Sequence, residues 1–101
     1  MEDKASFEEL RSQIASLDES ILLSIAQRKF CSESIAELKE KRSESLRVPE
    51  IEREVYKRNL ELGKKLGLEK KFVFHLTKLI LKHSLKCQKK HIENRKSQKS
   101  V

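Results

Sequence analysis

Apolar residues recur along the first forty residues of the chain at the spacing of an α-helix. Steps of three and four residues keep side chains on one helical face. Ser6 followed by Glu9 also matches a capping box, so we expect one helix from about Phe7 to about Arg42. At 1.5 Å per residue it would be roughly 54 Å long, longer than a domain of this size is wide. The apolar stripe consists of Leu10, Ile14, Leu17, Ile21 and Ile25, and it resumes at Ile35 and Leu38.

The segment SESLRVPE interrupts this pattern. Pro49 suits the first turn of a second helix, which we expect to end near Gly67, where glycine can adopt a left-handed cap. A third helix should follow and carry an inner face of its own. The pattern therefore predicts an all-α chain of a long, a short and a long helix. The expected inner face of the third helix consists of Phe72, Val73, Leu76, Leu79, Ile80 and Cys87.

The composition favours association with another chain. Of the 101 residues, 39% are charged, 37% are apolar and 5% are aromatic. A lone domain of this size buries only a modest part of its surface, and with so few apolar residues this chain would have a small hydrophobic core. We expect a partner chain to cover the long helix. No apolar window is long enough to cross a membrane, and we expect a cytoplasmic protein with no membrane partner.

Charge is spread unevenly along the chain. Residues 1–46 carry three more acidic than basic side chains, whereas residues 47–101 carry ten more basic than acidic ones. The basic end KKHIENRKSQKS can be a solvated, frayed helix end or a segment that tracks nucleic acid. No aromatic RNA-binding signature supports nucleic acid. We therefore expect a folded domain over residues 1–90 and a frayed basic tail over residues 91–101.

Two cations interrupt the apolar stripe of the first helix. Arg28 and Lys39 are eleven residues apart, which places them within about 20° of each other on the helix. A desolvated cation without a partner is unfavourable. Either the two side chains form ion pairs or extend to solvent at a helix interface, or they bind an anionic ligand.

Further polar residues lie where this ligand could be bound. Ser84 and Gln88, four residues apart, put a hydroxyl and a primary amide on the inner face of the third helix. Glu52 adds an acceptor in the first turn of the second helix. Arg11 also lies near the first stripe, but about 25 Å from Arg28 along the helix. Only an antiparallel partner chain could bring both arginines to one small ligand.

The signatures of metal, nucleotide and nucleophile chemistry are absent. There is no G-x-S-x-G, P-loop, H-E-x-x-H or dinucleotide fingerprint in the sequence. His75, His83 and His91 are eight residues apart, so each is rotated by about 80° from the last and they do not form a one-face metal site. We expect no metal and no cofactor. The remaining polar set suits a small polyanion and catalysis by electrostatic placement.

The runs LRSQIASLDESILLSIAQR, RVPE, LELGKKLGL and LTKLILKHSLKCQ, with Lys39 between the first two, resemble the all-helical AroQ-class (type II) chorismate mutases without gaps from Leu10 to Gln88. The resemblance implies an intertwined homodimeric helical bundle with two active sites shared between chains. It also implies the rearrangement of chorismate to prephenate on the route to phenylalanine and tyrosine. The implied roles are carboxylate binding by Arg28, Ser84 and the other subunit's Arg11, donation to the ether oxygen by Lys39 and Gln88, and acceptance from the ring hydroxyl by Glu52.

One part of the pattern departs from this family. Ile51 stands where the family usually has a carboxylate-binding arginine, and Val48 stands where it often has an acidic residue. Arg47 and Arg53 are the nearby candidates for partial compensation, although Arg53 lies about 200° around the helix from Ile51. We therefore expect a weakened mutase. The competing hypotheses are an isochorismate–pyruvate lyase and an inactive helical dimer that binds anionic partners or nucleic acid through its basic half.

Overall fold

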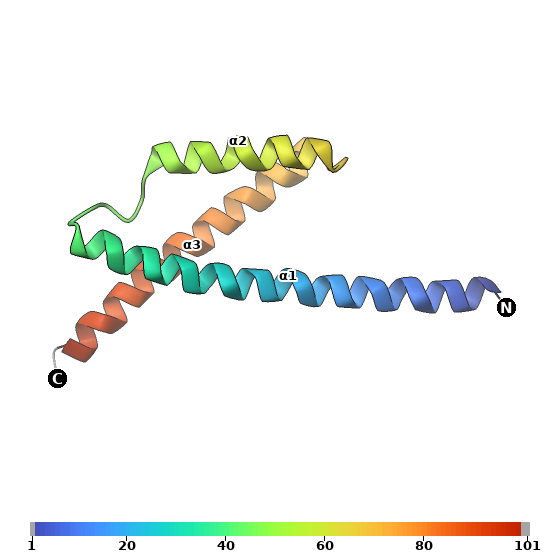
Figure 1. The fold of residues 1–101 in the computed structure, drawn as a ribbon, viewed down its shortest axis with the longest axis horizontal. Coiled ribbons are helices and arrows are strands. Elements are labelled where there is room, and N and C mark those ends of the chain that lie inside the picture. The colour runs from blue at the N-terminus through green and yellow to red at the C-terminus, as the bar shows by residue number, and fades with distance from the viewer. Residues whose placement is uncertain (1, 100–101) are drawn as a thin grey trace. The chain divides into compact units, whose positions relative to one another are not determined.

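The computed structural model describes residues 2–99, which form three α-helices joined by two short loops (Figure 1). Helix α1 spans Glu2–Lys41, α2 spans Pro49–Lys65 and α3 spans Lys70–Lys99. No strand occurs within the described range. The predicted all-α chain of a long, a short and a long helix is confirmed. None of the helices in this range has an apolar stretch long enough to cross a membrane.

The chain divides into two compact units. The first covers residues 1–30 and contains most of α1, and the second covers residues 31–101 and contains the last turns of α1 with α2 and α3. In the single chain, the apolar stripe of the first unit is solvent-exposed, with exposed fractions between 56% and 62%. These side chains are Phe7, Leu10, Ile14, Leu17 and Ile21.

Helix α1 begins earlier than the sequence suggested. Its first residue is Glu2, so Ser6 lies within the helix and the predicted capping box was wrong. The four residues before Ser6 include no glycine or proline, and the helix can therefore continue toward the N-terminus. After Lys41 the chain turns through Ser43, whose φ of 56° is in the left-handed region.

Helix α2 has the expected start and end signals. Pro49 occupies the first turn, where a missing backbone N–H is tolerated. At the other end Gly67 adopts a φ of 75°, and the backbone N–H of Leu68 donates to the Gly63 carbonyl at 2.9 Å. The predicted stop near Gly67 is confirmed, since a side chain with Cβ would be strained at that φ.

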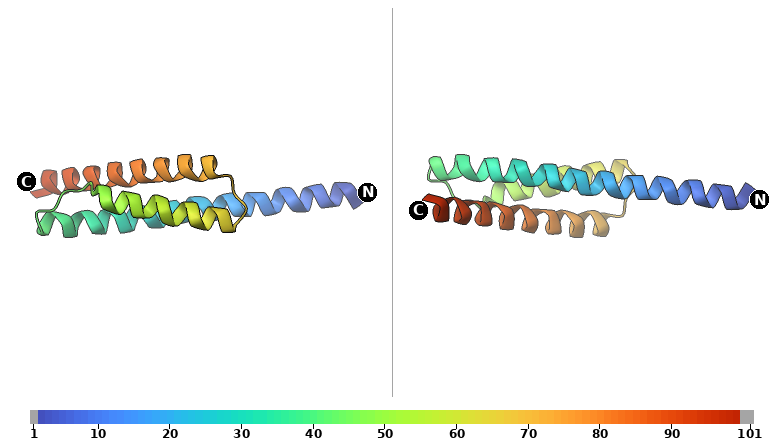
Figure 2. Two further views of the ribbon diagram at one scale, coloured as in Figure 1. Left: turned by 90° about the horizontal axis from the view of Figure 1, so that it is seen from above. Right: turned by 90° about the horizontal axis from the view of Figure 1, so that it is seen from below.

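Helices α2 and α3 run in opposite directions (Figure 2), and the Val73 side chain of α3 approaches α2 closely at Gly63. A Cβ on Gly63 would lie 2.6 Å from Val73 Cγ2, so glycine permits this approach. The Asn59 side-chain amide donates to Thr77 Oγ1 at 3.2 Å, and Thr77 is fully buried. This part of α3 is therefore fixed by α2.

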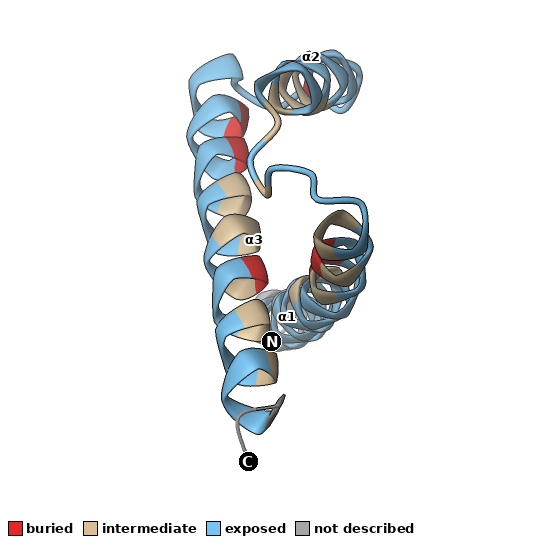
Figure 3. Ribbon diagram, turned by 90° about the vertical axis from the view of Figure 1, so that its left-hand side faces the viewer, coloured by how far each residue is buried: buried red, intermediate tan, exposed pale blue. Residues whose placement is uncertain are grey.

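The inner face of α3 is rotated from the predicted one. Figure 3 shows buried and half-buried residues of α3 along the side that faces α2 and the last turns of α1. Val73 is buried as expected, and Thr77 and Gln88 are buried too. Phe72, Leu76 and Leu79, which we also expected on this face, are exposed in the single chain. Ser84 and Gln88 make inner contacts as expected, whereas the buried Thr77 was not expected on this face.

Helix α3 extends further than we expected. The sequence predicted fraying from residue 91, whereas the structure continues the helix to Lys99. His91 and Arg95 both contact acidic side chains of α1. Charge-assisted contacts of this kind hold a helix end that its own composition would leave solvated.

Candidate active site

A small cavity of about 80 Å³ lies where the end of α1, the start of α2 and the middle of α3 meet. All of its lining residues belong to the unit of residues 31–101. Four of the site candidates from the sequence line it together, Lys39, Glu52, Ser84 and Gln88, and so do the uncertain positions Arg47, Val48 and Ile51. The lining residues are Lys39, Leu46, Arg47, Val48, Ile51, Glu52, Leu81, Ser84, Leu85 and Gln88.

Lys39 reaches the cavity from the last turn of α1. Its Nζ donates to the backbone carbonyl of Leu46 at 2.5 Å and to Gln88 Oε1 at 3.4 Å. An ammonium group has three protons, so these two contacts leave a third for a ligand oxygen. The half-buried amine is therefore directed by the loop and by α3 rather than extended into solvent.

Gln88 supplies a second donor from α3. Its side chain is buried, and its amide oxygen accepts from Lys39. The amide nitrogen is the other end of the same group and can only donate. A primary amide has no charge to gain or lose near neutral pH, so this donor is constant across that range.

Ser84 lies one turn before Gln88 and contacts a residue that the sequence analysis missed. The hydroxyl of Ser32 donates to Ser84 Oγ at 3.2 Å, and Ser32 is itself buried. Ser32 lies four residues after Arg28 and seven before Lys39, so it shares their helical face. A search of this face for serine as well as for charged residues would have found Ser32.

An ion pair forms the α2 side of the cavity. Arg47 Nε lies 3.2 Å from Glu52 Oε2, and its Nη2 donates to Glu52 Oε1 at 3.2 Å. The hydrogen bond to Glu52 raises the pKa of the Arg47 guanidinium. Ile51 and Val48 make the rest of this wall apolar.

The two candidate arginines near Ile51 differ in position. Arg47 lines the cavity. Arg53 does not, and its Nη2 instead lies 3.7 Å from Glu50 Oε1, with both side chains 71% exposed. Only Arg47 is therefore placed to meet a ligand in this cavity.

Arg11 and Arg28 belong to the other unit, residues 1–30. Arg28 is half-buried. The guanidinium of Arg11 lies 5.5 Å from the centre of the Phe7 ring, within reach of a cation–π interaction. Neither residue is among those that line the cavity of the second unit.

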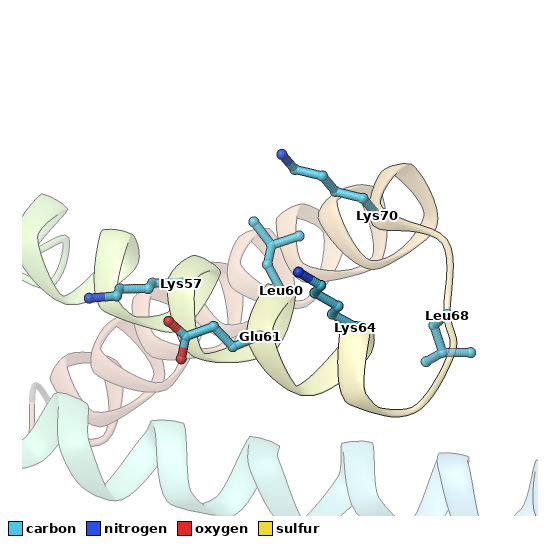
Figure 4. Close-up of a pocket in the computed structure, with 6 residues that line it drawn as sticks. All are labelled: Lys57, Leu60, Glu61, Lys64, Leu68 and Lys70. Carbon is cyan, nitrogen blue, oxygen red and sulfur yellow. The ribbon is translucent and has the colours of Figure 1, made fainter.

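A larger hollow of about 520 Å³ borders α2 and the start of α3 (Figure 4). It holds none of the residues singled out in the sequence. Its lysines Lys57 and Lys70 point in different directions rather than toward one ligand. In the part of the chain that the structure describes, no three His, Cys, Asp or Glu side chains are grouped so as to hold a metal ion.

Residues 10–89 match a family model described as chorismate mutase type II. The matched span is most of the chain, and it contains every residue singled out as a site candidate. The chain belongs to the type II chorismate mutase family. Residues 90–99 of α3, including His91 and Arg95, lie beyond the part that matches the family model.

Named relatives fall into two groups by length. A bifunctional chorismate mutase/prephenate dehydratase of Buchnera aphidicola subsp. Schizaphis graminum is 33% identical over 90 residues, which are 89% of this chain and 23% of that protein. A second protein of that name, from Buchnera aphidicola subsp. Acyrthosiphon pisum, is 31% identical over 80 residues. The chain thus spans less than a quarter of these bifunctional proteins. A chorismate mutase of Methanocaldococcus jannaschii is 27% identical over 85 residues, covering 84% of this chain and 86% of that one.

Proposed function

We propose that this chain catalyses the rearrangement of chorismate to prephenate. The observation that supports this most directly is the cavity in which Lys39, Ser84 and Gln88 meet, within the residues that match the chorismate mutase model. The relative of similar length from Methanocaldococcus jannaschii bears the name chorismate mutase. The reaction needs neither a nucleophile nor a metal, which agrees with the chemistry of the lining residues.

Lys39 and Gln88 act on the bond that breaks. In the pericyclic transition state the C–O bond lengthens, and negative charge grows on the ether oxygen. The Lys39 ammonium and the Gln88 amide, joined at 3.4 Å, place two donors beside that oxygen before the charge appears. The cavity also holds the enolpyruvyl arm over the ring, which lowers the entropic part of the barrier.

Glu52 and Ser84 position the rest of the substrate. Glu52 accepts from the ring hydroxyl, and Ser84 assists at a carboxylate. Ile51 has no group that can bind a carboxylate, so Arg47 takes over part of that role from the same wall. Arg47 is already shared with Glu52, and its interaction with the substrate is correspondingly weaker. This predicts a mutase of reduced activity.

A second copy of the chain completes each site. The exposed apolar stripe of residues 1–30 is a surface of the kind that another chain covers. An antiparallel copy would bring its Arg11 to the substrate, while Arg28 is provided by the first chain, and the two guanidinium groups would bind the two carboxylates. In this proposal residues 1–90 form the catalytic domain and residues 91–101 are a basic extension. The enzyme works in the cytoplasm, where free cysteines such as Cys31 and Cys87 stay reduced.

The test is turnover of chorismate by the purified chain, with the product identified. Prephenate as product supports the proposal, and release of pyruvate from isochorismate would favour the lyase hypothesis instead. Lys39→Met should abolish most of the activity, whereas Lys41→Met, which removes an exposed lysine two residues away, should not. Absence of turnover would point to the inactive dimer. Sedimentation of the same sample reports whether two chains associate.

A further inference from the structure

A row of acidic side chains at the end of α1 contacts two basic side chains near the end of α3. His91 Nε2 lies 2.9 Å from Glu37 Oε1, and its Nδ1 lies 3.4 Å from Glu33 Oε2. Arg95 Nη1 donates to Glu40 Oε1 at 3.4 Å. Arg95 Nε also lies 3.8 Å from Glu37 Oε1. These five residues are called the clamp.

The clamp lies directly beside the two proposed donors. Glu37 and Glu40 flank Lys39 in the sequence, and His91 follows Gln88 by three residues on the same side of α3. Within a helix such neighbours move together, because the backbone hydrogen bonds fix their spacing. A shift of the clamp therefore shifts Lys39 or Gln88.

The hydrogen bond and the close approach that join α2 to α3 lie well before Gln88. The close approach of α2 to α3 is at Val73 and Thr77, eleven or more residues before Gln88. The contact between Lys39 and Gln88 joins two flexible side chains at 3.4 Å, which is long for a hydrogen bond. The Ser32–Ser84 hydrogen bond holds α3 one turn before Gln88, and the clamp holds it one to two turns beyond.

We propose that the clamp positions the Gln88 amide against Lys39 and so sets the rate of the rearrangement, an inference that rests on the proposed function. His91 and Arg95 are positioning residues, since they touch the carboxylates of α1 and not the cavity. Both lie beyond the residues that match the family model, so the match does not supply this role.

The charge state of the clamp agrees with this role. The hydrogen bond with His91 lowers the pKa of the Glu37 carboxyl, and the nearby charges of Arg95, His91 and Lys41 act in the same direction. Glu37 is therefore ionised at neutral pH and available to both basic side chains. Partly exposed pairs are individually weak, and a network of several is needed to hold a helix.

The first test reverses one charge and then restores the pair. Arg95→Glu should lower kcat about tenfold while KM changes by less than about twofold, because donors that act in the transition state are displaced. The double variant Glu40→Arg with Arg95→Glu should recover most of the loss. Lys90→Glu is the matched control, since it makes the same charge change at an exposed position of α3.

The second test reads the position of Gln88 without turnover. In NMR spectra of the full chain, the side-chain amide signals of Gln88 should shift in Arg95→Glu, return in the double variant and stay in place in Lys90→Glu. Unchanged Gln88 signals would overturn the clamp, and so would shifted signals with an unchanged kcat in an active enzyme. If the wild-type chain does not turn over chorismate, the proposed function fails, and the NMR result alone decides whether the clamp positions Gln88.

Discussion

The Arg47 guanidinium holds the Glu52 carboxylate at 3.2 Å on the wall of the cavity that Ile51 also lines. The proposed hydroxyl acceptor and the remaining arginine of this wall are thus engaged with each other. A substrate must share both groups. The contact uses Nε and Nη2 of Arg47, so the remaining edge of the guanidinium is the one that a carboxylate would meet.

Restoring an arginine at position 51 should raise activity. A charged donor in a preorganised site is typically worth about 10²–10³ in rate, and part of that gain should return in Ile51→Arg. We expect kcat/KM for chorismate to rise at least about tenfold. Glu54→Arg adds an arginine at an exposed position of the same helix and should have no comparable effect. An unchanged kcat/KM in Ile51→Arg would show that position 51 is not beside the substrate carboxylate.

Arg47 and Arg53 should differ in their effect on substrate binding. Arg47→Met removes a cation from the cavity wall, and KM should rise about tenfold, as expected for the loss of one charge-assisted contact of about 1.4 kcal/mol. Arg53→Met removes an exposed side chain and should leave KM near the wild-type value. Steady-state kinetics of the two variants give both KM values. Equal effects on KM would contradict the proposal that Arg47 rather than Arg53 binds the substrate.

Gln88 should make the reaction insensitive to pH near neutrality. Its amide does not titrate, so kcat/KM should be nearly constant between about pH 6 and 8. In Gln88→Glu the carboxyl must be protonated to donate, so kcat/KM should fall as the pH rises across that range. The fall in kcat/KM of Gln88→Glu is measured against the value of the same variant at low pH. A steep decline in the wild-type enzyme would contradict the role of Gln88.

Acid should weaken the fold through Glu37. Its pKa lies below the usual 4.5 because of the hydrogen bond with His91. The contribution to stability is therefore complete above about pH 4.5 and is lost as the pH falls through the lower folded-state value. Urea unfolding should show that Glu37→Gln has a lower free energy of unfolding than the wild type at pH 7. On acidification, the free energy of unfolding should fall less in Glu37→Gln than in the wild type. Glu54→Gln, at an exposed position, should have the same free energy of unfolding as the wild type both at pH 7 and in acid.

Gly63 should tolerate no side chain while Val73 faces it. In Gly63→Ala the new Cβ would lie 2.6 Å from Val73 Cγ2, so either the Val73 side chain must rotate or α2 and α3 must separate. We expect a loss of about 1–3 kcal/mol in the free energy of unfolding, typical of overpacking. Adding Val73→Ala should recover part of that loss by making room. Thermal or urea unfolding measures both, and an additive double variant would exclude steric conflict as the cause.

Much of the fold could be predicted from residues whose local preference agrees with the tertiary structure. The apolar stripe predicts the long helix α1, and Pro49 and Gly67 mark the start and the end of α2. Ser6 misled us, because a capping sequence is active only where the chain before it leaves the helix, and here the preceding residues continue it. The inner face of α3 was predicted in part, since Val73 and Gln88 are buried as expected while the buried Thr77 was not expected there.

The candidate site could be predicted only as far as helical periodicity extends. Periodicity placed Lys39 on the inner stripe of α1 and Gln88 on that of α3, and the structure brings them together. It could not choose between Arg47 and Arg53, because Arg47 belongs to a loop whose path has no period. The clamp contacts of Arg95 join residues about fifty-five apart, and a single sequence holds no signal for such a pairing.

Lys39 is a structural support of the loop as well as a donor. Its backbone carbonyl accepts from the Glu44 N–H at 2.8 Å, while its ammonium group donates to the Leu46 carbonyl. The same residue therefore contacts the loop that leads to Arg47 at two points, Glu44 and Leu46. Shortening the lysine by substitution would remove its contact with the Leu46 carbonyl, while the backbone hydrogen bond from Glu44 would remain, so the loop that leads to Arg47 would lose one of these two supports. Kinetic loss at position 39 then measures two events, and a lysine analogue of equal length with a neutral head group would separate them.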